Sequence, residues 1–205
     1  MSAERPLRNR VDPFGELHAV AARGAMMGNR GGKFHRDDQT LGRRHWTSKQ
    51  WIVCVCEFKN RKRDVWRRYY TELFFLDEAT AFAAGHRPCF ECRRAEAEAF
   101  RNAFSATARV SAPEMDERLH RERLADGRKR LHETAIESLP DGAMIAMRGA
   151  VFAVKGAFLL PWSFQGYGAS IARPASGVVD ALTPPSTLEA IRQGYAPRWT
   201  PPASA

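Results

Sequence analysis

Four cysteines in two close pairs constrain this chain more than any other feature of its sequence. Cys54 and Cys56 are separated by one residue, and Cys89 and Cys92 by two. The second pair lies in a segment typical of a tight turn, where two thiolates can reach one cation while turn amides stabilise their charge. Zinc requires four ligands at tetrahedral corners, so further ligands have to come from elsewhere. We therefore predict a zinc site built from Cys89 and Cys92 together with Cys54 and Cys56.

The first pair is less typical of zinc, because ordinary zinc knuckles leave two or more residues between their ligands. One of Cys54 and Cys56 could instead be a small buried core residue, in which case a histidine would complete the site. The histidines that could serve are, in order of preference, His35, His86 and His45. A thioredoxin-like redox pair and a catalytic cysteine are the alternatives to metal binding.

The charge of the chain favours polyanionic partners. Lys and Arg exceed Asp and Glu by nine, which attracts polyanions by Coulomb interaction and counterion release, although a merely solvated surface is the alternative. No apolar stretch reaches the roughly 18–20 residues of a membrane helix, and the first residues do not form a secretory signal. We therefore expect a cytoplasmic protein without a membrane partner.

The pattern of apolar and turn residues predicts an α+β fold. We expect strands over residues 51–58 and 69–76, joined as a β-hairpin with a long basic tip. A helix over residues 78–84, capped by Asp77 and ended by Gly85, precedes the Cys89–Cys92 turn, and a second helix covers residues 93–106. These elements are expected to form a hairpin and helix module that zinc holds together. The module lies within residues 1–110, and its N-terminal region is rich in glycine. Its run Gly28–Gly32 could be an anion-binding nest or an ordinary loop.

Residues 111–205 are expected to hold a helix and a small antiparallel β region. Ser111 and Glu114 are spaced as a capping box that opens a helix ending near residue 124. Short strands are predicted over residues 144–147, 151–155 and 157–160, and a last helix follows Thr183 and ends at Gly194. The boundary near 110 is weakly marked, so the two parts could form one domain. The aromatic segment 160–168 could line a pocket or plug the core, and the second reading is preferred.

At residues 70–94 the sequence resembles a known family. The segment Ala83-Ala84-Gly85-His86-Arg87-Pro88-Cys89-Phe90-Glu91-Cys92-Arg93, with the strand and short helix before it, resembles the second half of the Ada-type zinc-binding domain. The resemblance implies that Cys89 and Cys92 are the second pair of zinc ligands. In that family four cysteines hold zinc, and one of the first pair can accept a methyl group from DNA phosphotriesters. The family's first pair has three residues between its cysteines, whereas Cys54 and Cys56 have one. The whole chain also resembles a family of bacterial proteins, and that resemblance implies no chemistry.

The segment from Lys59 to Tyr70 interleaves cations with aromatic residues and is a candidate nucleic-acid finger. Arginine and lysine contact phosphates, and an aromatic ring can stack on an unpaired base. The candidate contacts are Arg61, Lys62, Arg63, Trp66, Arg67 and Arg68. The alternative is a solvated hairpin tip whose aromatic rings pack on the body of the protein. A second cationic stretch, residues 118–130, is diluted by acids and reads as intrahelical ion pairs.

These features lead to three hypotheses about function. The first is a zinc-binding protein that binds nucleic acid, with DNA repair as the suggested process. The second is an enzyme, either a methyl-accepting repair protein or a metal-assisted hydrolase or nuclease centred near His35, Cys54 and Cys56. Asp37 and Asp38 could assist such a hydrolysis, although the common hydrolase and metalloprotease motifs are absent from the sequence. The third is a protein-interaction module whose surface is shaped by zinc.

Overall fold

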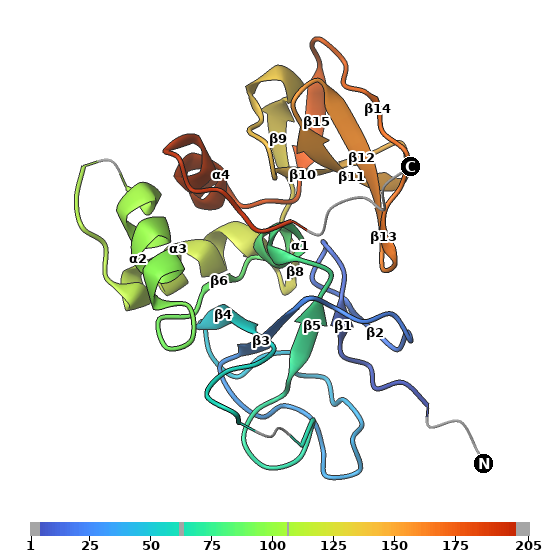
Figure 1. Ribbon diagram of the computed structural model, residues 1–205, viewed down its shortest axis with the longest axis vertical. Helices are drawn as coiled ribbons and strands as arrows, with labels where there is room; N and C mark the ends of the chain where they lie inside the picture. The colour runs from blue at the N-terminus through green and yellow to red at the C-terminus, as the bar shows by residue number, and fades with distance from the viewer. Residues whose placement is uncertain (1–4, 62–63, 106, 200–205) are drawn as a thin grey trace.

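The computed structural model describes residues 5–61, 64–105 and 107–199. The expected α+β class is confirmed, because four α-helices accompany mixed and antiparallel sheets in the described part of the chain. Figure 1 shows an N-terminal sheet in the lower part of the molecule and a second sheet at the upper right, with the short helix α1 between them. Among the described helices, none combines the length and the apolar character needed to cross a lipid bilayer.

The N-terminal sheet has the strand order β2-β1-β5-β3-β4-β6. Its strands are β1 (Arg10–Val11), β2 (Leu17–His18), β3 (Met26–Arg30), β4 (Trp51–Val55), β5 (Leu73–Phe75) and β6 (Arg87–Pro88). Strand β3 pairs antiparallel with both β4 and β5, whereas β4 pairs with β6 in parallel.

The predicted hairpin of residues 51–58 and 69–76 is therefore wrong. The two strands exist in shorter form, but β3 lies between them, so they do not pair with each other. Gly28 permits this insertion, because a Cβ there would lie 2.3 Å from the carbonyl oxygen of Ile52 and 2.9 Å from the ring of Phe75. The expected anion nest or loop over Gly28–Gly32 is also wrong, since residues 28–30 belong to the strand and their backbone groups serve the sheet.

The helices follow the local sequence signals. Helix α1 (Glu78–Ala83) is capped by Asp77, whose Oδ1 accepts from the amide of Thr80 at 2.9 Å, and Gly85 follows the helix with a φ of +84°. Helix α2 (Arg94–Phe104) buries the apolar face that its periodicity predicts. Helix α3 (Ala112–Arg123) begins with the predicted capping box of Ser111 and Glu114. These three expectations are confirmed.

The second sheet has the order β13-β12-β11-β10-β15-β9, and β14 pairs with β12. Its strands are β9 (His132–Ala135), β10 (Met144–Met147), β11 (Ala150–Lys155), β12 (Phe158–Ser163), β13 (Gly166–Tyr167), β14 (Ile171–Ala172) and β15 (Val178–Ala181). A small hairpin of β7 (Leu124–Ala125) and β8 (Arg128–Lys129) precedes it, a 3-10 turn (Ile136–Ser138) follows β9, and helix α4 (Pro185–Arg192) follows β15. The predicted antiparallel region and last helix are confirmed.

The aromatic segment 160–168 packs on helix α1. The hydroxyl of Tyr167 donates to Oδ2 of Asp77 at 2.9 Å, and Nε1 of Trp162 donates to Oγ1 of Thr80 at 3.0 Å. The second sheet is thereby tied to the N-terminal cap of α1, which agrees with the core-plugging interpretation.

The main hydrophobic core draws on both parts of the chain. Leu73 and Phe82 from the N-terminal part pack in one cluster with Leu119 of α3, Ile191 of α4 and Tyr195. Helices α2 and α4 lie against each other over this core. The segments on either side of residue 110 therefore share this cluster, while a second cluster within residues 136–188 lies under the second sheet alone.

Candidate metal centre

Three of the four cysteines converge at one edge of the N-terminal sheet. The Sγ atoms of Cys54, Cys89 and Cys92 all lie within 4.8 Å of one another, and they form the group of potential metal ligands found among the described residues. We call this group the cysteine trio. Cys54 and Cys89 are buried, and Cys92 is partly exposed, so the trio borders the surface.

The register of the sheet brings the trio together. Strand β6 pairs with β4 so that Pro88 lies beside Val53, and the amide of Cys89 donates to the carbonyl of Val53 at 3.0 Å. This places Cys89 next to Cys54, which follows Val53 on β4. The parallel pairing thus joins two cysteines that are far apart in the sequence.

The turn from Cys89 to Cys92 has the form of a metal knuckle. The amide of Glu91 donates to Sγ of Cys89 at 3.4 Å, and the amide of Arg93 donates to the carbonyl oxygen of Cys89 at 3.0 Å. Amides directed at sulfur stabilise the thiolate, which is the form that binds metal. Helix α2 begins directly after this turn and holds it in place.

The thiols of the trio influence one another. Hydrogen bonds from Cys54 and Cys92 lower the pKa of Cys89, while the hydrogen bond to Cys89 raises the pKa of Cys54. The three thiols therefore share their protons through these hydrogen bonds. A bound cation would replace these shared protons, because each cysteine ligand has to be deprotonated.

Cys56 lies just beyond the end of β4 and outside the trio. Its Sγ donates to the carbonyl oxygen of Ala25 at 3.5 Å. Its side chain is partly buried and packs against the small cluster of Met27, Cys54 and Cys89. Three of the four cysteines predicted as ligands therefore lie together, and the fourth, Cys56, lies nearby but outside the trio.

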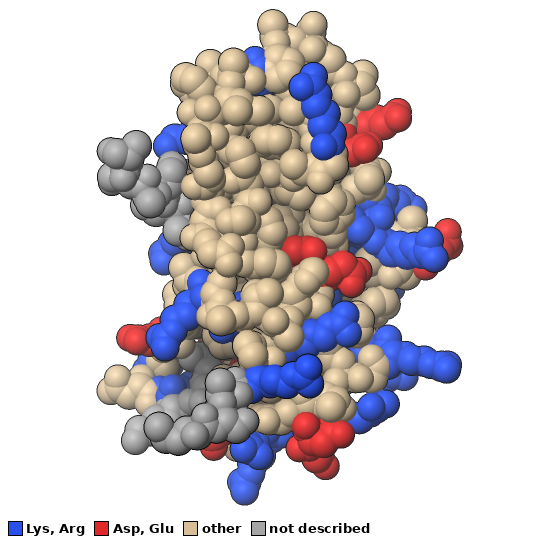
Figure 2. All heavy atoms as spheres, turned by 90° about the vertical axis from the view of Figure 1, so that its right-hand side faces the viewer, with Lys and Arg blue, Asp and Glu red and all other residues tan. Residues whose placement is uncertain are grey.

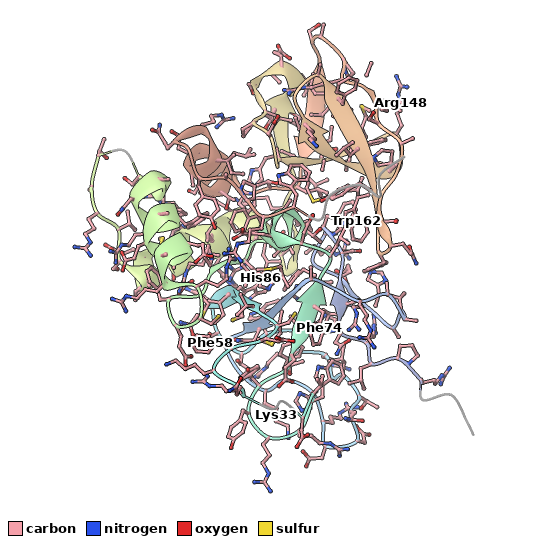
Figure 3. All side chains as sticks on the ribbon, viewed as in Figure 1. Lys33, Phe58, Phe74, His86, Arg148 and Trp162 are labelled. Carbon is pink, nitrogen blue, oxygen red and sulfur yellow. The ribbon has the colours of Figure 1, made fainter. Side chains whose placement is uncertain are left out.

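The three histidines named as substitutes lie elsewhere. The ring of His35 stacks on Trp66 at 5.3 Å, its Nδ1 is 2.9 Å from Oγ1 of Thr71, and burial lowers its pKa. His86 is buried beside Arg30, at 3.4 Å from Nε2 to Nε of the arginine, and Figure 3 shows it near the centre of the molecule. His45 lines a small cavity described below. None of the three belongs to the group of potential metal ligands found in the described residues.

The two acidic residues suggested for hydrolysis are exposed, and their carboxylates bond to neighbouring residues of the same loop. Asp37 forms an ion pair with Lys33, and Asp38 accepts from the amide and hydroxyl of Thr40. Both hydrogen-bonding patterns lower the pKa of the carboxyl group concerned. Neither carboxylate joins the cysteine trio.

The basic segment forms a loop beside the trio. Nη2 of Arg61 lies 2.6 Å from Oε1 of Glu91, which joins the start of the loop to the knuckle. Arg67, Arg68 and Tyr69 are exposed, and 81% of the Tyr69 surface is accessible. Lys62 and Arg63 lie outside the described residues.

Trp66 occupies a different place from the one proposed for base stacking. Only 1% of its surface is exposed, its Nε1 donates to the carbonyl oxygen of Glu72 at 2.9 Å, and its amide donates to Oε2 of Glu72 at 2.8 Å. The ring also stacks on His35. Trp66 is thus the buried anchor of the loop, as the alternative reading of this segment expected.

A groove of about 870 Å³ runs along the loop. Its described lining residues are Asp37, Arg61, Asp64, Trp66, Arg67, Arg68, Tyr69, Tyr70 and Glu72. The arginines and carboxylates of this lining balance each other in number. Arg67 and Arg68 are exposed cations of this lining, and Arg61 is exposed as well but paired with Glu91.

The charges of the molecule are unevenly distributed. On the face shown in Figure 2, lysines and arginines gather over the lower part, whereas the upper part, built on the second sheet, is largely uncharged. Arg148 lies on the outer side of the second sheet, far from the loop (Figure 3).

A group of buried cations was not predicted from the sequence. Arg30 and Arg123 are almost fully buried. Arg123 thus differs from the intrahelical ion pairs predicted for the cations of residues 118–130, of which Arg121 with Glu117 is one. The sequence held one signal of this burial, because Arg123 follows Met115 and Leu119 at intervals of four and so lies on the buried face of α3.

A search of family models, a search of curated proteins and a search of solved structures each found no match to this chain.

Proposed function

We propose that this is a zinc-binding protein whose metal centre fixes a basic loop for contact with nucleic acid. The observation that carries the proposal is the convergence of Cys54, Cys89 and Cys92 at the root of that loop. The ion pair of Arg61 with Glu91, between the two knuckle cysteines, connects metal centre and loop.

Zinc is the metal that best suits the trio. Zn–S bonds of about 2.3 Å at tetrahedral angles separate neighbouring sulfurs by about 3.8 Å, so the three sulfurs need only a small adjustment around the ion. Thiolate ligands also favour zinc over calcium or magnesium, which prefer oxygen. Cys56 is the closest protein candidate for the fourth position, and a water molecule is the alternative.

Metal analysis of the purified protein tests the first half of the proposal. We expect about one zinc per chain. Cys54→Ser, Cys89→Ser and Cys92→Ser should each lower zinc content and stability, because metal binding contributes folding free energy. Cys56→Ser is the matched comparison: loss of zinc would identify Cys56 as the fourth ligand, and retention would indicate a water ligand. Wild-type protein without zinc after expression in zinc-supplemented medium would contradict the proposal.

Titration of fluorescently labelled single-stranded DNA and RNA tests the second half. Affinity should fall steeply between about 50 and 200 mM salt, because phosphate contacts release counterions. The double variant Arg67→Ala/Arg68→Ala should bind roughly ten-fold more weakly. Arg148→Ala/Lys155→Ala removes the same charge from exposed sites on the second sheet and serves as the control. Equal losses in both double variants would refute the loop as the contact surface, and no binding by the wild-type protein would refute nucleic-acid binding; neither outcome affects the zinc proposal.

A second candidate is a methyl-accepting repair protein. The specific observation in its favour is the cysteine trio, in which the hydrogen bonds from Cys54 and Cys92 and the amide of Glu91 lower the pKa of Cys89. A thiolate of the trio would attack the methyl carbon of a phosphotriester, so that a C–S bond forms, the methyl C–O bond breaks and the DNA phosphodiester leaves. Incubation with DNA containing methyl phosphotriesters, followed by peptide mass analysis, should then find a methyl group on one cysteine of the trio. Unmodified cysteines after incubation with the methylated DNA would exclude this activity.

A further inference from the structure

Two arginines from distant parts of the chain meet around one buried tryptophan. The Cζ atoms of Arg30, on β3, and Arg123, at the end of α3, lie 3.9 and 4.0 Å from the ring centre of Trp51. The two arginines are only 2% and 1% exposed. Gly85 allows this approach, because a Cβ there would lie 2.6 Å from Cδ of Arg123.

The hydrogen bonds of these arginines go to neutral groups. Nη2 of Arg30 donates to the carbonyl oxygen of Gly15 at 2.8 Å. Nη1 and Nη2 of Arg123 donate to the carbonyl oxygens of Gly85 and Lys49, at 3.0 and 2.7 Å, and Nη2 also lies 2.9 Å from Nδ1 of His120. Nε of Arg123 is buried without a hydrogen-bond partner in the described structure.

Lys129 adds a third cation to this group. It lies on β8, is partly buried, and donates from Nζ to the carbonyl oxygen of Ala83. Burial and the neighbouring Arg123 lower the pKa of Lys129 to about 7, and burial lowers the pKa of each arginine to about 9. Burial is the largest cause of all three shifts, so each of these cations is held where water stabilises its charge poorly.

Carboxylates are near the cluster but do not form ion pairs with it in the described structure. Asp12 lies 2.8 Å from His18, and Asp116 forms a bidentate ion pair with Arg87. Glu16 is exposed and lines the cavity beside the cations. Buried cations without paired anions are costly, so a site that keeps three of them close together is suited to an anionic ligand.

The three cations line a common cavity of about 40 Å³. A cavity needs only about 10–15 Å³ on this scale to hold one water, so this one has room for a small group. Its wall also includes His45 and Trp46, which are partly buried, and Trp51. The ring of Trp46 lies 5.9 Å from that of Trp51 and offers an aromatic surface next to the cations.

We propose that the cavity formed by Arg30, Arg123 and Lys129 binds a phosphate group, either free or at the end of a nucleotide. Guanidinium groups bind phosphate oxygens by charge-assisted hydrogen bonds, and the ammonium group adds a third charge. Trp46 provides a surface on which the base of a nucleotide can stack. This site is separate from the cysteine trio and does not require metal.

Isothermal titration calorimetry of the full chain with inorganic phosphate, in a phosphate-free buffer at constant ionic strength, tests the proposal. Saturable binding is expected, and adenosine 5′-monophosphate in a parallel titration distinguishes the two sources. Tighter binding of the nucleotide would identify a nucleotide site, whereas equal or weaker binding would identify a site for free phosphate. Absence of saturable binding of both compounds to the wild-type protein would overturn the proposal.

Two neighbouring substitutions locate the bound group. Lys129→Met removes the cavity cation and should weaken binding about ten-fold or more, because a charge-assisted hydrogen bond is lost. Arg128→Met removes the same charge from the adjacent exposed position on β8 and should leave binding within about two-fold. Circular dichroism checks that both variants are folded. Equal affinities of the two variants would place the phosphate elsewhere and refute the assignment.

Discussion

Substitution of Glu78 by glutamine should be among the most destabilising conservative changes in this protein. The side chains of Glu78 and Arg93 are both 0% exposed, and Oε1 of Glu78 lies 2.6 Å from Nη1 of Arg93. The same oxygen accepts from the hydroxyl of Tyr195 at 2.8 Å, and Oε2 accepts from the amide of Arg198 at 2.8 Å. One carboxylate thus connects α1, the residue after the cysteine knuckle and the C-terminal segment.

The size of the expected stability loss follows from the charge of Arg93, which stays buried after the substitution. Removal of one partner of a buried ion pair costs about 3–5 kcal/mol, because the other charge stays buried without compensation. Here Glu96 lies 3.9 Å from Nε of Arg93 and supplies part of that compensation. Glutamine also retains one acceptor oxygen. We therefore expect a loss of about 3 kcal/mol, a large share of the roughly 5–15 kcal/mol that stabilises an ordinary domain.

Urea unfolding followed by far-ultraviolet circular dichroism measures this loss, and a double variant tests its cause. Glu78→Gln/Arg93→Met removes the orphaned charge, so it should be no less stable than Glu78→Gln alone. Glu96→Gln is the control and should cost less than about 1 kcal/mol, because its contact with Arg93 is long and its ion pair with Arg198 is largely exposed to solvent. A loss below 1 kcal/mol for Glu78→Gln, or simple additivity in the double variant, would refute the reasoning.

Three further changes test other parts of the fold. Trp66→Ala should cost about 3–5 kcal/mol in urea unfolding, because the ring is buried; unchanged stability would show that Trp66 is not a core residue. The pKa of Lys129 falls from 10.5 to about 7 on folding, so the unfolded chain binds more protons between these values and wild-type stability should rise with pH there. Lys129→Met should lose this rise in phosphate-free buffer, and an identical pH profile would contradict the shift. Ser111→Ala should lose about 0.5–2 kcal/mol through the capping box with Glu114, and a thermal midpoint equal to that of wild type would exclude the cap.

Local signals predicted the elements that depend on local chemistry. Asp77, Gly85 and the pair Ser111 and Glu114 mark helix ends through hydrogen bonds to nearby backbone, so they could be recognised without tertiary structure. The turn that holds Cys89 and Cys92 is of the same kind.

Features that depend on distant partners could not be predicted in this way. Strand β3 contains Gly28, which is unfavourable in an isolated strand and becomes favourable only where Ile52 and Phe75 approach closely. The period of two placed Cys54 and Cys56 on one face, but β4 ends at Val55, so pairing with β6 positions only Cys54. Trp66 lies among charged residues in the sequence, and its burial depends on Glu72 and His35 across the loop.

The mixed origin of the main core has a consequence for synthesis of the chain. Val11 and Phe82 emerge from the ribosome well before Ile191 and Tyr195, yet all four residues share one interior. Until then the first sheet exposes apolar surface, and contacts of such long sequence separation form slowly. The nascent protein therefore has a long interval in which chaperones can bind its exposed apolar surface.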